Sequence, residues 1–184
     1  MKTEHELAKA LKEMMATRPI DDISVMEISK KCGVSRKTFY YHYHDMYDLL
    51  TQVFLDEKIP NLNLANNFVE LLKVVFDYYK KNEAFISASL NSAGKELLSE
   101  FMYNAFYTTI LRFIIKIDAN KSVPIATRKN IAKFYAYGYS NSFVYYLANH
   151  KNKTLEGLKG SFSFISYENF VKIVQNAGKK EEKC

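Results

Sequence analysis

The sequence contains no tryptophan, three prolines and six glycines among its 184 residues. A protein built from many short strands needs frequent turns, and those turns are rich in glycine and proline. The scarcity of both residues excludes a turn-rich β architecture, so we expect an all-α fold. No apolar run approaches the roughly 18 residues that are needed to cross a bilayer.

Cysteine is also scarce, with only Cys32 and Cys184 in the chain. The two form no metal-ligand pair and indicate no disulfide framework, so a reduced compartment fits best. The first residues, MKTEHELAKALKEMM, are charged and amphipathic, and they lack the apolar core and the small-residue cleavage site of a secretion signal. We therefore expect a cytoplasmic protein.

Catalytic motifs are missing as well: the chain has no G-x-S-x-G, H-E-x-x-H or P-loop pattern. Its four histidines are scattered, and His42 and His44, two positions apart, do not share a helix face on which both could hold a metal. We expect Cys32 to be a small buried hydrophobe rather than a nucleophile. The sequence therefore predicts no enzyme, no catalytic residue, no metal site and no cofactor.

The net charge of +6 is unevenly distributed and does not by itself indicate nucleic-acid binding. Residues 1–60 hold nine Lys/Arg and ten Asp/Glu, a balance of −1, whereas residues 61–184 hold seventeen and ten, a balance of +7. One local basic patch stands out. Between Ile28 and His44 there is no carboxylate, and the patch has four cations: Lys30, Lys31, Arg36 and Lys37.

The stretch from Ser24 to Leu50 predicts two short helices joined by a tight turn, followed by the start of a third. Ser24 and Glu27 form a capping box at the start of the first of these helices. Gly33 ends that helix in a position suited to the left-handed conformation, and Ser35 can cap the next. This arrangement, over about residues 24–43, is typical of a DNA-binding helix-turn-helix motif.

Hydrophobic periodicity predicts helices throughout the rest of the chain. We expect them over about 3–17, from His44 to about 59, over about 17 residues around Phe68–Tyr79, and over 83–90, 97–117, 125–150 and 166–176. Residues 118–124 and 151–161 are expected to be loops. A break near residues 58–64 separates a three-helix head, residues 1–60, from a helical-bundle body, residues 61–184.

The second helix of the motif opens with six residues that could contact DNA: Arg36, Lys37, Thr38, Tyr40, Tyr41 and His42. Arginine and lysine at this position can reach guanine edges or phosphates. Threonine, tyrosine and histidine commonly bond phosphates, which fix the register of the protein on the duplex. The alternative is a solvated basic face with two tyrosines packed in the core. Because all six follow a glycine turn, we favour DNA contact.

The segment GVSRKTFYYHYHDMYDLL resembles the TetR family signature, and the resemblance covers about residues 5–55. It implies that Arg36 and Lys37 specify the operator, whereas Thr38, Tyr40, Tyr41 and His42 contact DNA alongside Ser24 and Ser35 at the helix starts. Family members commonly carry a lysine near the start of the fourth helix, where this chain has Met46. One phosphate contact is therefore in doubt, and its loss would flatten the salt dependence of binding by about one charge.

The resemblance also implies a homodimer with a four-helix interface and a small effector bound in the body. The helix at 125–150 and the last helix are the candidates, and the proposed pocket residues are Phe106, Phe113, Tyr135 and Tyr139. Five phenols in one helix are too many for a dry core, because buried hydroxyls need partners. These tyrosines could line a ligand pocket, form a protein interface or lie on the surface, and the sequence does not choose among the three. For any single residue, packing in the core is the alternative.

Two functions follow as hypotheses. The first is a homodimeric repressor that binds a roughly palindromic double-stranded DNA operator and is released by a small-molecule effector. The second is a TetR-like co-activator or protein-interaction module that acts through a partner protein. TFYYHY together with YDLL resembles the subgroup related to the dihydroxyacetone kinase operon activator, which supports the second hypothesis.

Overall fold

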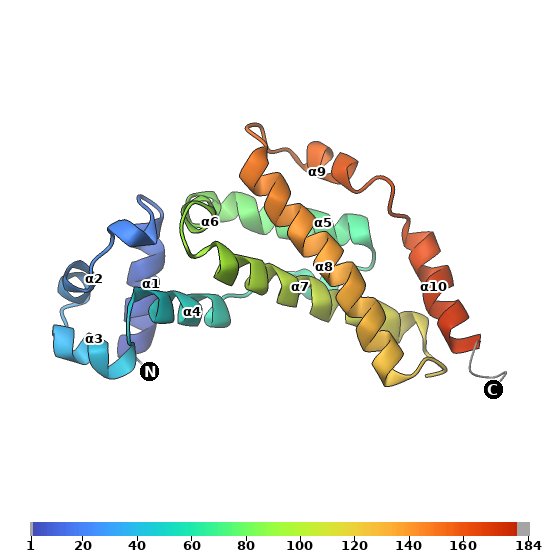
Figure 1. Cartoon of the computed structure of the whole chain (residues 1–184), viewed down its shortest axis with the longest axis horizontal. Coiled ribbons are helices and arrows are strands. Elements are labelled where there is room, and N and C mark those ends of the chain that lie inside the picture. The colour runs from blue at the N-terminus through green and yellow to red at the C-terminus, as the bar shows by residue number, and fades with distance from the viewer. Residues whose placement is uncertain (1, 180–184) are drawn as a thin grey trace. The chain divides into compact units, whose positions relative to one another are not determined.

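The computed structural model describes residues 2–179, and the regular structure in that range is entirely helical, as predicted (Figure 1). Its ten α-helices are α1 (Lys2–Met15), α2 (Val25–Lys31), α3 (Arg36–His42), α4 (Met46–Asp56), α5 (Phe68–Lys81), α6 (Glu83–Leu90), α7 (Lys95–Ile117), α8 (Ile125–Asn149), α9 (Leu155–Ser161) and α10 (Tyr167–Lys179), with short 3-10 turns η1 (Ile20–Asp22) and η2 (Leu62–Leu64). Cys184 lies outside the described residues. Within them, no helix is long and apolar enough to cross a membrane.

The chain divides into two compact units. The first contains the residues up to Lys58 together with Tyr79–Phe101, and the second contains Ile59–Tyr78 and the residues from Met102 on. Helices α5 and α7 therefore contribute residues to both units. The inclusion of α6 in the first unit was not expected from the sequence.

Helix α1 forms the centre of the first unit, where it packs against α2, α4 and α6. Its apolar face is completely buried at Leu7 and Leu11. A polar side chain links the same helix to two others. The Lys12 ammonium lies 2.6 Å from the Glu57 carboxylate, directly after α4, and 5.4 Å from the ring centre of Phe85 in α6. The helix-turn-helix elements are thus built onto a continuous helical core.

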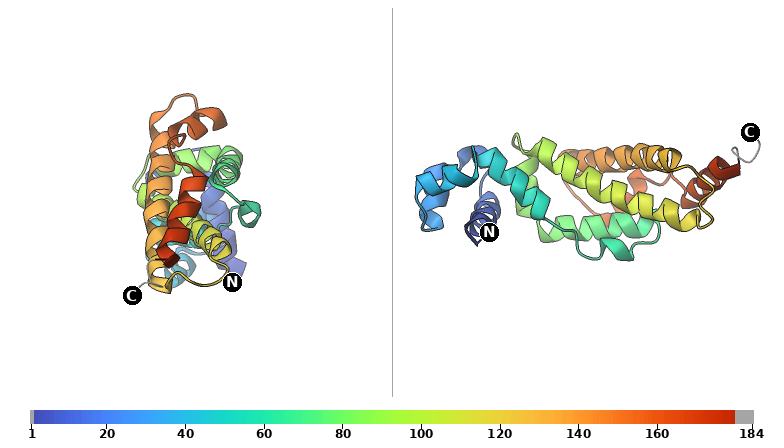
Figure 2. Two further views of the ribbon diagram at one scale, coloured as in Figure 1. Left: turned by 90° about the vertical axis from the view of Figure 1, so that its right-hand side faces the viewer. Right: turned by 90° about the horizontal axis from the view of Figure 1, so that it is seen from below.

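The second unit is built around α8, which packs against α7, α9 and α10 (Figure 2). The predicted loop between α7 and α8 is closed by Asp118, which is almost fully buried. Its carboxylate accepts hydrogen bonds from the amides of Ser122 and Val123 and lies 2.8 Å from the guanidinium of Arg128. This buried, fully bonded carboxylate fixes the turn between the two long helices.

The prediction of a loop over Lys151–Ser161 is wrong, because the structure places α9 there. Two glycines in a polar segment favoured a loop, but a tertiary contact stabilises the helix instead. Thr154 caps α9 by accepting the amide of Gly157 at 3.0 Å, and its own backbone amide and carbonyl both bond the hydroxyl of Tyr146. A Cβ atom on Gly157 would lie 2.6 Å from that hydroxyl, so glycine permits the close approach.

Candidate DNA-binding site

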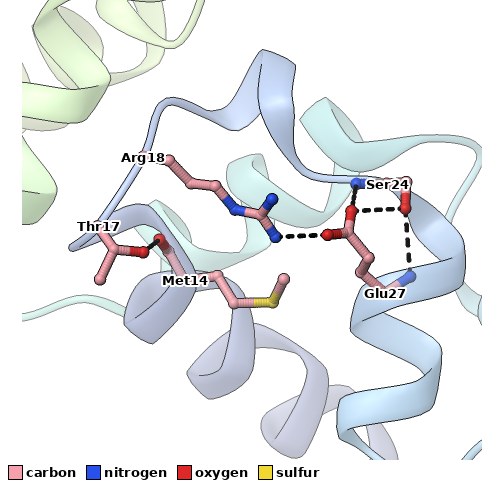
Figure 3. A network of polar contacts seen from close by, with 5 residues as sticks. All are labelled: Met14, Thr17, Arg18, Ser24 and Glu27. Atoms are coloured by element: carbon pink, nitrogen blue, oxygen red, sulfur yellow. Dashed lines mark hydrogen bonds and ion pairs between the residues drawn. The ribbon is translucent and has the colours of Figure 1, made fainter.

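Hydrogen bonds at the start of α2 position the first helix of the motif. The Ser24 hydroxyl accepts the amide of Glu27 at 3.2 Å, and the Glu27 carboxylate accepts the Ser24 amide at 2.9 Å, which completes the predicted capping box (Figure 3). The guanidinium of Arg18, 2.7 Å from the same carboxylate, ties the segment after α1 to α2. The hydrogen bonds from Ser24 and Arg18 lower the pKa of Glu27 to about 2.

The turn between α2 and α3 depends on a glycine. Gly33 has φ of +66°, in the left-handed region that residues with a Cβ atom adopt at a cost. The amide of Val34 closes the turn by bonding the carbonyl of Ser29 at 3.0 Å. Ser35 then caps α3, because its hydroxyl accepts the amide of Thr38 at 3.0 Å. The left-handed glycine and both serine caps agree with the sequence prediction.

The outer face of α3 carries four of the predicted contact residues. Phe39 is completely buried and anchors the helix to the core of the first unit. Arg36 and Lys37 are exposed, and neither forms an ion pair within the described residues. Tyr40 and Tyr41 are also exposed, Tyr41 to 85%. This face therefore presents two unpaired cations and two phenols to solvent.

The other predicted contact residues are engaged within the protein. The hydroxyl of Ser24 lies 2.7 Å from the Glu27 carboxylate, and the hydroxyls of Ser35 and Thr38 lie 2.9 Å apart. These groups stabilise the helix starts, so any DNA contact that they make comes in addition to a cap. The side chain of His42 is only 18% exposed, and its Nδ1 lies 3.3 Å from Oε1 of Glu4 in α1.

The start of α4 is occupied by carboxylates of the protein. Asp45 accepts the amides of Tyr47 and Asp48, each at 2.8 Å, and Asp48 accepts the amide of His44 at 3.0 Å. Met46, which takes the place of the family's usual lysine, is 9% exposed. This end of the helix therefore offers no side-chain cation to a DNA phosphate.

Two features of the site were not found from the sequence. Glu4 was not expected to meet His42, because a contact between distant segments leaves no local signal. The basic patch is also smaller than its four cations indicate, since Lys31 lies 2.9 Å from Glu13 of α1 and is paired. Lys30 is exposed, and no ion pair involves it within the described residues. It adds an unpaired cation at the end of α2.

The four predicted effector-pocket residues lie in one aromatic cluster in the second unit. The ring of Phe68 lies 6.2 Å from Phe113, 5.7 Å from Tyr135 and 4.7 Å from Tyr139, centre to centre, and Phe106 lies 5.8 Å from Tyr139. The Tyr139 hydroxyl is buried without a hydrogen-bond partner among the described residues, and burial raises its pKa. The packing is compatible with a core and with a ligand site.

Two family models match the chain. Residues 7–53 match the model described as bacterial regulatory proteins, tetR family, and residues 66–165 match the model described as transcriptional regulator C-terminal region. The chain is also 31% identical over 77 residues to the HTH-type dhaKLM operon transcriptional activator DhaS of Lactococcus lactis subsp. lactis (strain IL1403). That match covers 42% of this chain and 36% of the relative, so it spans little more than a third of the relative's length.

Solved structures share the fold at low sequence identity. The dihydroxyacetone kinase operon activator DhaS has a TM-score of 0.59 and 19% identity, and the match covers 96% of each chain. A tetR-family transcriptional regulator from Streptomyces coelicolor has a TM-score of 0.58 and 14% identity, with 96% of this chain and 89% of that chain covered. Since the C-terminal model alone covers more than half of the sequence and the N-terminal model covers the helix-turn-helix, the chain belongs to the TetR family of DNA-binding transcriptional regulators.

Proposed function

We propose that the chain acts as a homodimer and binds a roughly palindromic operator through α3 of each subunit. The exposed face of α3 carries this proposal, because Arg36 and Lys37 have no ion-pair partner within the described residues. Such side chains at the start of a recognition helix reach guanine edges or phosphates. Two heads related by a two-fold axis would read half-sites about one helical turn apart.

The remaining contacts of this interface are assigned to phosphates. Tyr40 and Tyr41 are exposed and carry hydroxyls that can donate to phosphate oxygens. Thr38 and His42 belong to the same short helix, and Ser24 and Ser35 cap α2 and α3 beside it. Phosphate contacts fix the register of the protein, so sequence discrimination rests on Arg36 and Lys37.

The dimer is assigned to α8 and α10. On α8, Phe134 is 76% exposed, and Tyr137 and Tyr145 on the same helix are exposed as well. Large apolar side chains gathered on one helix are typical of a protein interface. Tyr135 and Phe170, 4.8 Å apart between ring centres, pack α8 against α10, so both helices can contribute to one surface. A second copy would bury that surface.

Regulation is assigned to a small molecule that binds within the aromatic cluster of the second unit. The protein would act as a repressor, and binding of the small molecule would release it from its operator. The support is the unsatisfied hydroxyl of Tyr139 within a cluster of rings, since a buried polar group and aromatic walls are common features of ligand sites. The effector can act only to the extent that its affinity differs between the operator-binding and the released state.

A second candidate is an activator that works through a partner protein. It is favoured by the similarity of this chain to DhaS in sequence and in fold, because DhaS is an operon activator. A transcriptional reporter placed behind the operator distinguishes the candidates. Deleting the gene raises reporter expression if the protein represses, and lowers it if the protein activates.

Sequence-specific binding is tested by selecting duplexes from a random library with the purified protein. The proposal expects enrichment of a two-fold symmetric sequence by the wild type. The double variant Arg36→Ala/Lys37→Ala should not enrich that sequence. The matched control Lys73→Ala/Lys81→Ala removes two exposed lysines from α5 and should enrich the same sequence as the wild type. Failure of the wild-type protein to enrich any sequence contradicts the proposal.

A further inference from the structure

The last turn of α2 carries an exposed cation, Lys30, that is not among the proposed DNA contacts. Five cations lie between the end of α1 and the first turn of α3: Arg18, Lys30, Lys31, Arg36 and Lys37. Arg18 and Lys31 have carboxylate partners, at 2.7 and 2.9 Å. Lys30 forms neither an ion pair nor a side-chain hydrogen bond within the described residues. Its ammonium group is therefore available to a ligand outside the chain.

The carboxylate nearest to Lys30 in the sequence is engaged elsewhere. Glu27 lies three positions before Lys30 on α2, a spacing at which opposite charges on a helix ordinarily pair. Its Oε1 lies 2.7 Å from the guanidinium of Arg18, and its Oε2 accepts the amide and the hydroxyl of Ser24 at 2.9 and 2.7 Å (Figure 3). The helix cap and Arg18 thus occupy the carboxylate that could otherwise neutralise Lys30.

The side chain of Lys30 projects from a flank of α2 that is turned away from α1. Lys31 lies 2.9 Å from Glu13 of α1, so the flank that carries Lys31 faces α1. Successive residues of a helix are rotated by about 100°, which places Lys30 on another flank together with Met26. Met26 is 63% exposed, whereas Ile28, on nearly the opposite side of the helix from Lys30, is completely buried. Lys30 therefore projects into solvent.

Lys30 also lies directly at the turn that leads into the recognition helix. Its carbonyl accepts the amide of Gly33 at 3.2 Å, and α3 begins three residues later at Arg36. In helix-turn-helix proteins the second helix enters the major groove while the first crosses the sugar-phosphate backbone. A lysine binds phosphate as a point charge on a flexible four-carbon stem. A phosphate at the edge of the groove is thus the ligand that suits this position.

We propose that Lys30 binds a DNA phosphate beside the groove that α3 enters. The inference rests on the proposed operator binding. A phosphate contact carries no sequence information, so Lys30 strengthens binding to any duplex, in contrast to Arg36 and Lys37. Neutralising a phosphate also releases counterions, and each contact steepens the fall of log affinity with log salt by about 0.9. The contact of Lys30 is therefore measurable as a salt dependence.

The test is a set of fluorescence anisotropy titrations on two labelled duplexes of about 30 base pairs, one selected by the wild-type protein and one scrambled. Affinity is measured at salt concentrations from about 50 to about 200 mM. Three variants are compared with the wild type: Lys30→Gln, Lys30→Arg and, as the matched control, Lys31→Gln. The control removes the same charge from the neighbouring lysine, which is paired with Glu13.

Lys30→Gln should reduce the salt slope by about 0.9 for each bound subunit. Its loss of affinity should be similar for both duplexes and, for a dimer, should shrink by about tenfold between the two salt limits. Lys30→Arg keeps the charge and should keep the wild-type slope. Lys31→Gln should keep it as well, because Glu13 already compensates that charge.

Three results overturn the inference: an unchanged slope in Lys30→Gln, an equal reduction in Lys30→Gln and Lys31→Gln, or a loss confined to the selected duplex. The last result would assign Lys30 to a base instead of a phosphate. Failure of the proposed function gives a different result, because the wild type would then bind the selected duplex no more tightly than the scrambled one at every salt concentration.

Discussion

At the scale of single residues, Tyr139 has a hydroxyl that stability measurements can probe. The group is buried without a partner among the described residues, while its ring stacks on Phe162 at 4.7 Å. An unsatisfied buried hydroxyl costs about 1–3 kcal/mol. Tyr139→Phe keeps the ring and removes that cost, so we expect the free energy of unfolding in urea to rise by about 1 kcal/mol.

The matched control for this prediction is Tyr146→Phe. The Tyr146 hydroxyl bonds both the amide and the carbonyl of Thr154, so its removal should lower the free energy of unfolding by about 1–2 kcal/mol. A loss of stability in Tyr139→Phe would mean that its hydroxyl has a favourable role in the folded protein. If the hydroxyl also binds the proposed effector, the same variant loses its response to effector while it keeps operator binding.

Glu27 makes the folding stability of the head, residues 1–60, depend on pH. Hydrogen bonds from Ser24, and then the contact with Arg18, lower its pKa from an ordinary 4.5 to about 2. Because the folded value lies below the unfolded one, the stabilisation is complete above about pH 5 and is lost as the pH falls toward 2. We expect Glu27→Gln to be less stable than the wild type at pH 6 in urea unfolding. The difference should shrink as the pH is lowered to 3, and a constant difference would contradict the assignment.

Much of the helix-turn-helix could be predicted because its signals are local. The capping box of Ser24 and Glu27, the left-handed Gly33 and the Ser35 cap each involve residues a few positions apart in the sequence. The contact of Glu4 with His42 could not be found in this way, because it depends on how α1 packs against the motif. The sequence shows that Met46 replaces the family's usual lysine, but it does not show that the side chain of Met46 is buried.

At the scale of helices, α9 was not predicted, because its sequence pattern favours a loop whereas a tertiary contact stabilises a helix. Its two glycines weaken the helix, yet Gly157 is needed beside Tyr146. A Cβ atom there would lie 2.6 Å from a hydroxyl that is held by two hydrogen bonds. We therefore expect Gly157→Ala to lower the thermal unfolding midpoint.

Gly160 provides the control within the same helix. Nothing lies within 4 Å of a Cβ atom built on Gly160, so only the helix propensity changes there. Gly160→Ala should stabilise the protein by up to about 1 kcal/mol. If both alanine variants are stabilised, Gly157 is not required for the contact with Tyr146.

At the scale of the whole molecule, the chain is a TetR-family regulator, and that family is not enzymatic. Its proposed dimer depends on the exposed side chains of α8. Phe134→Glu places a charge at the most exposed aromatic position of α8, so we expect a monomer of unchanged helicity by sedimentation velocity and circular dichroism. Leu55→Glu, at another exposed apolar position, should stay dimeric. A dimeric Phe134→Glu protein would place the interface elsewhere.

The central claim is that the exposed face of α3 reads DNA sequence through Arg36 and Lys37. It is tested most directly by anisotropy titrations of the selected duplex and a scrambled duplex with the wild type and with Arg36→Ala/Lys37→Ala. Each good base contact contributes about 1–3 kcal/mol, so the double variant should lose at least about 30-fold in affinity for the selected duplex and bind both duplexes alike. Equal affinity of the variant and the wild type for the selected duplex would contradict the claim.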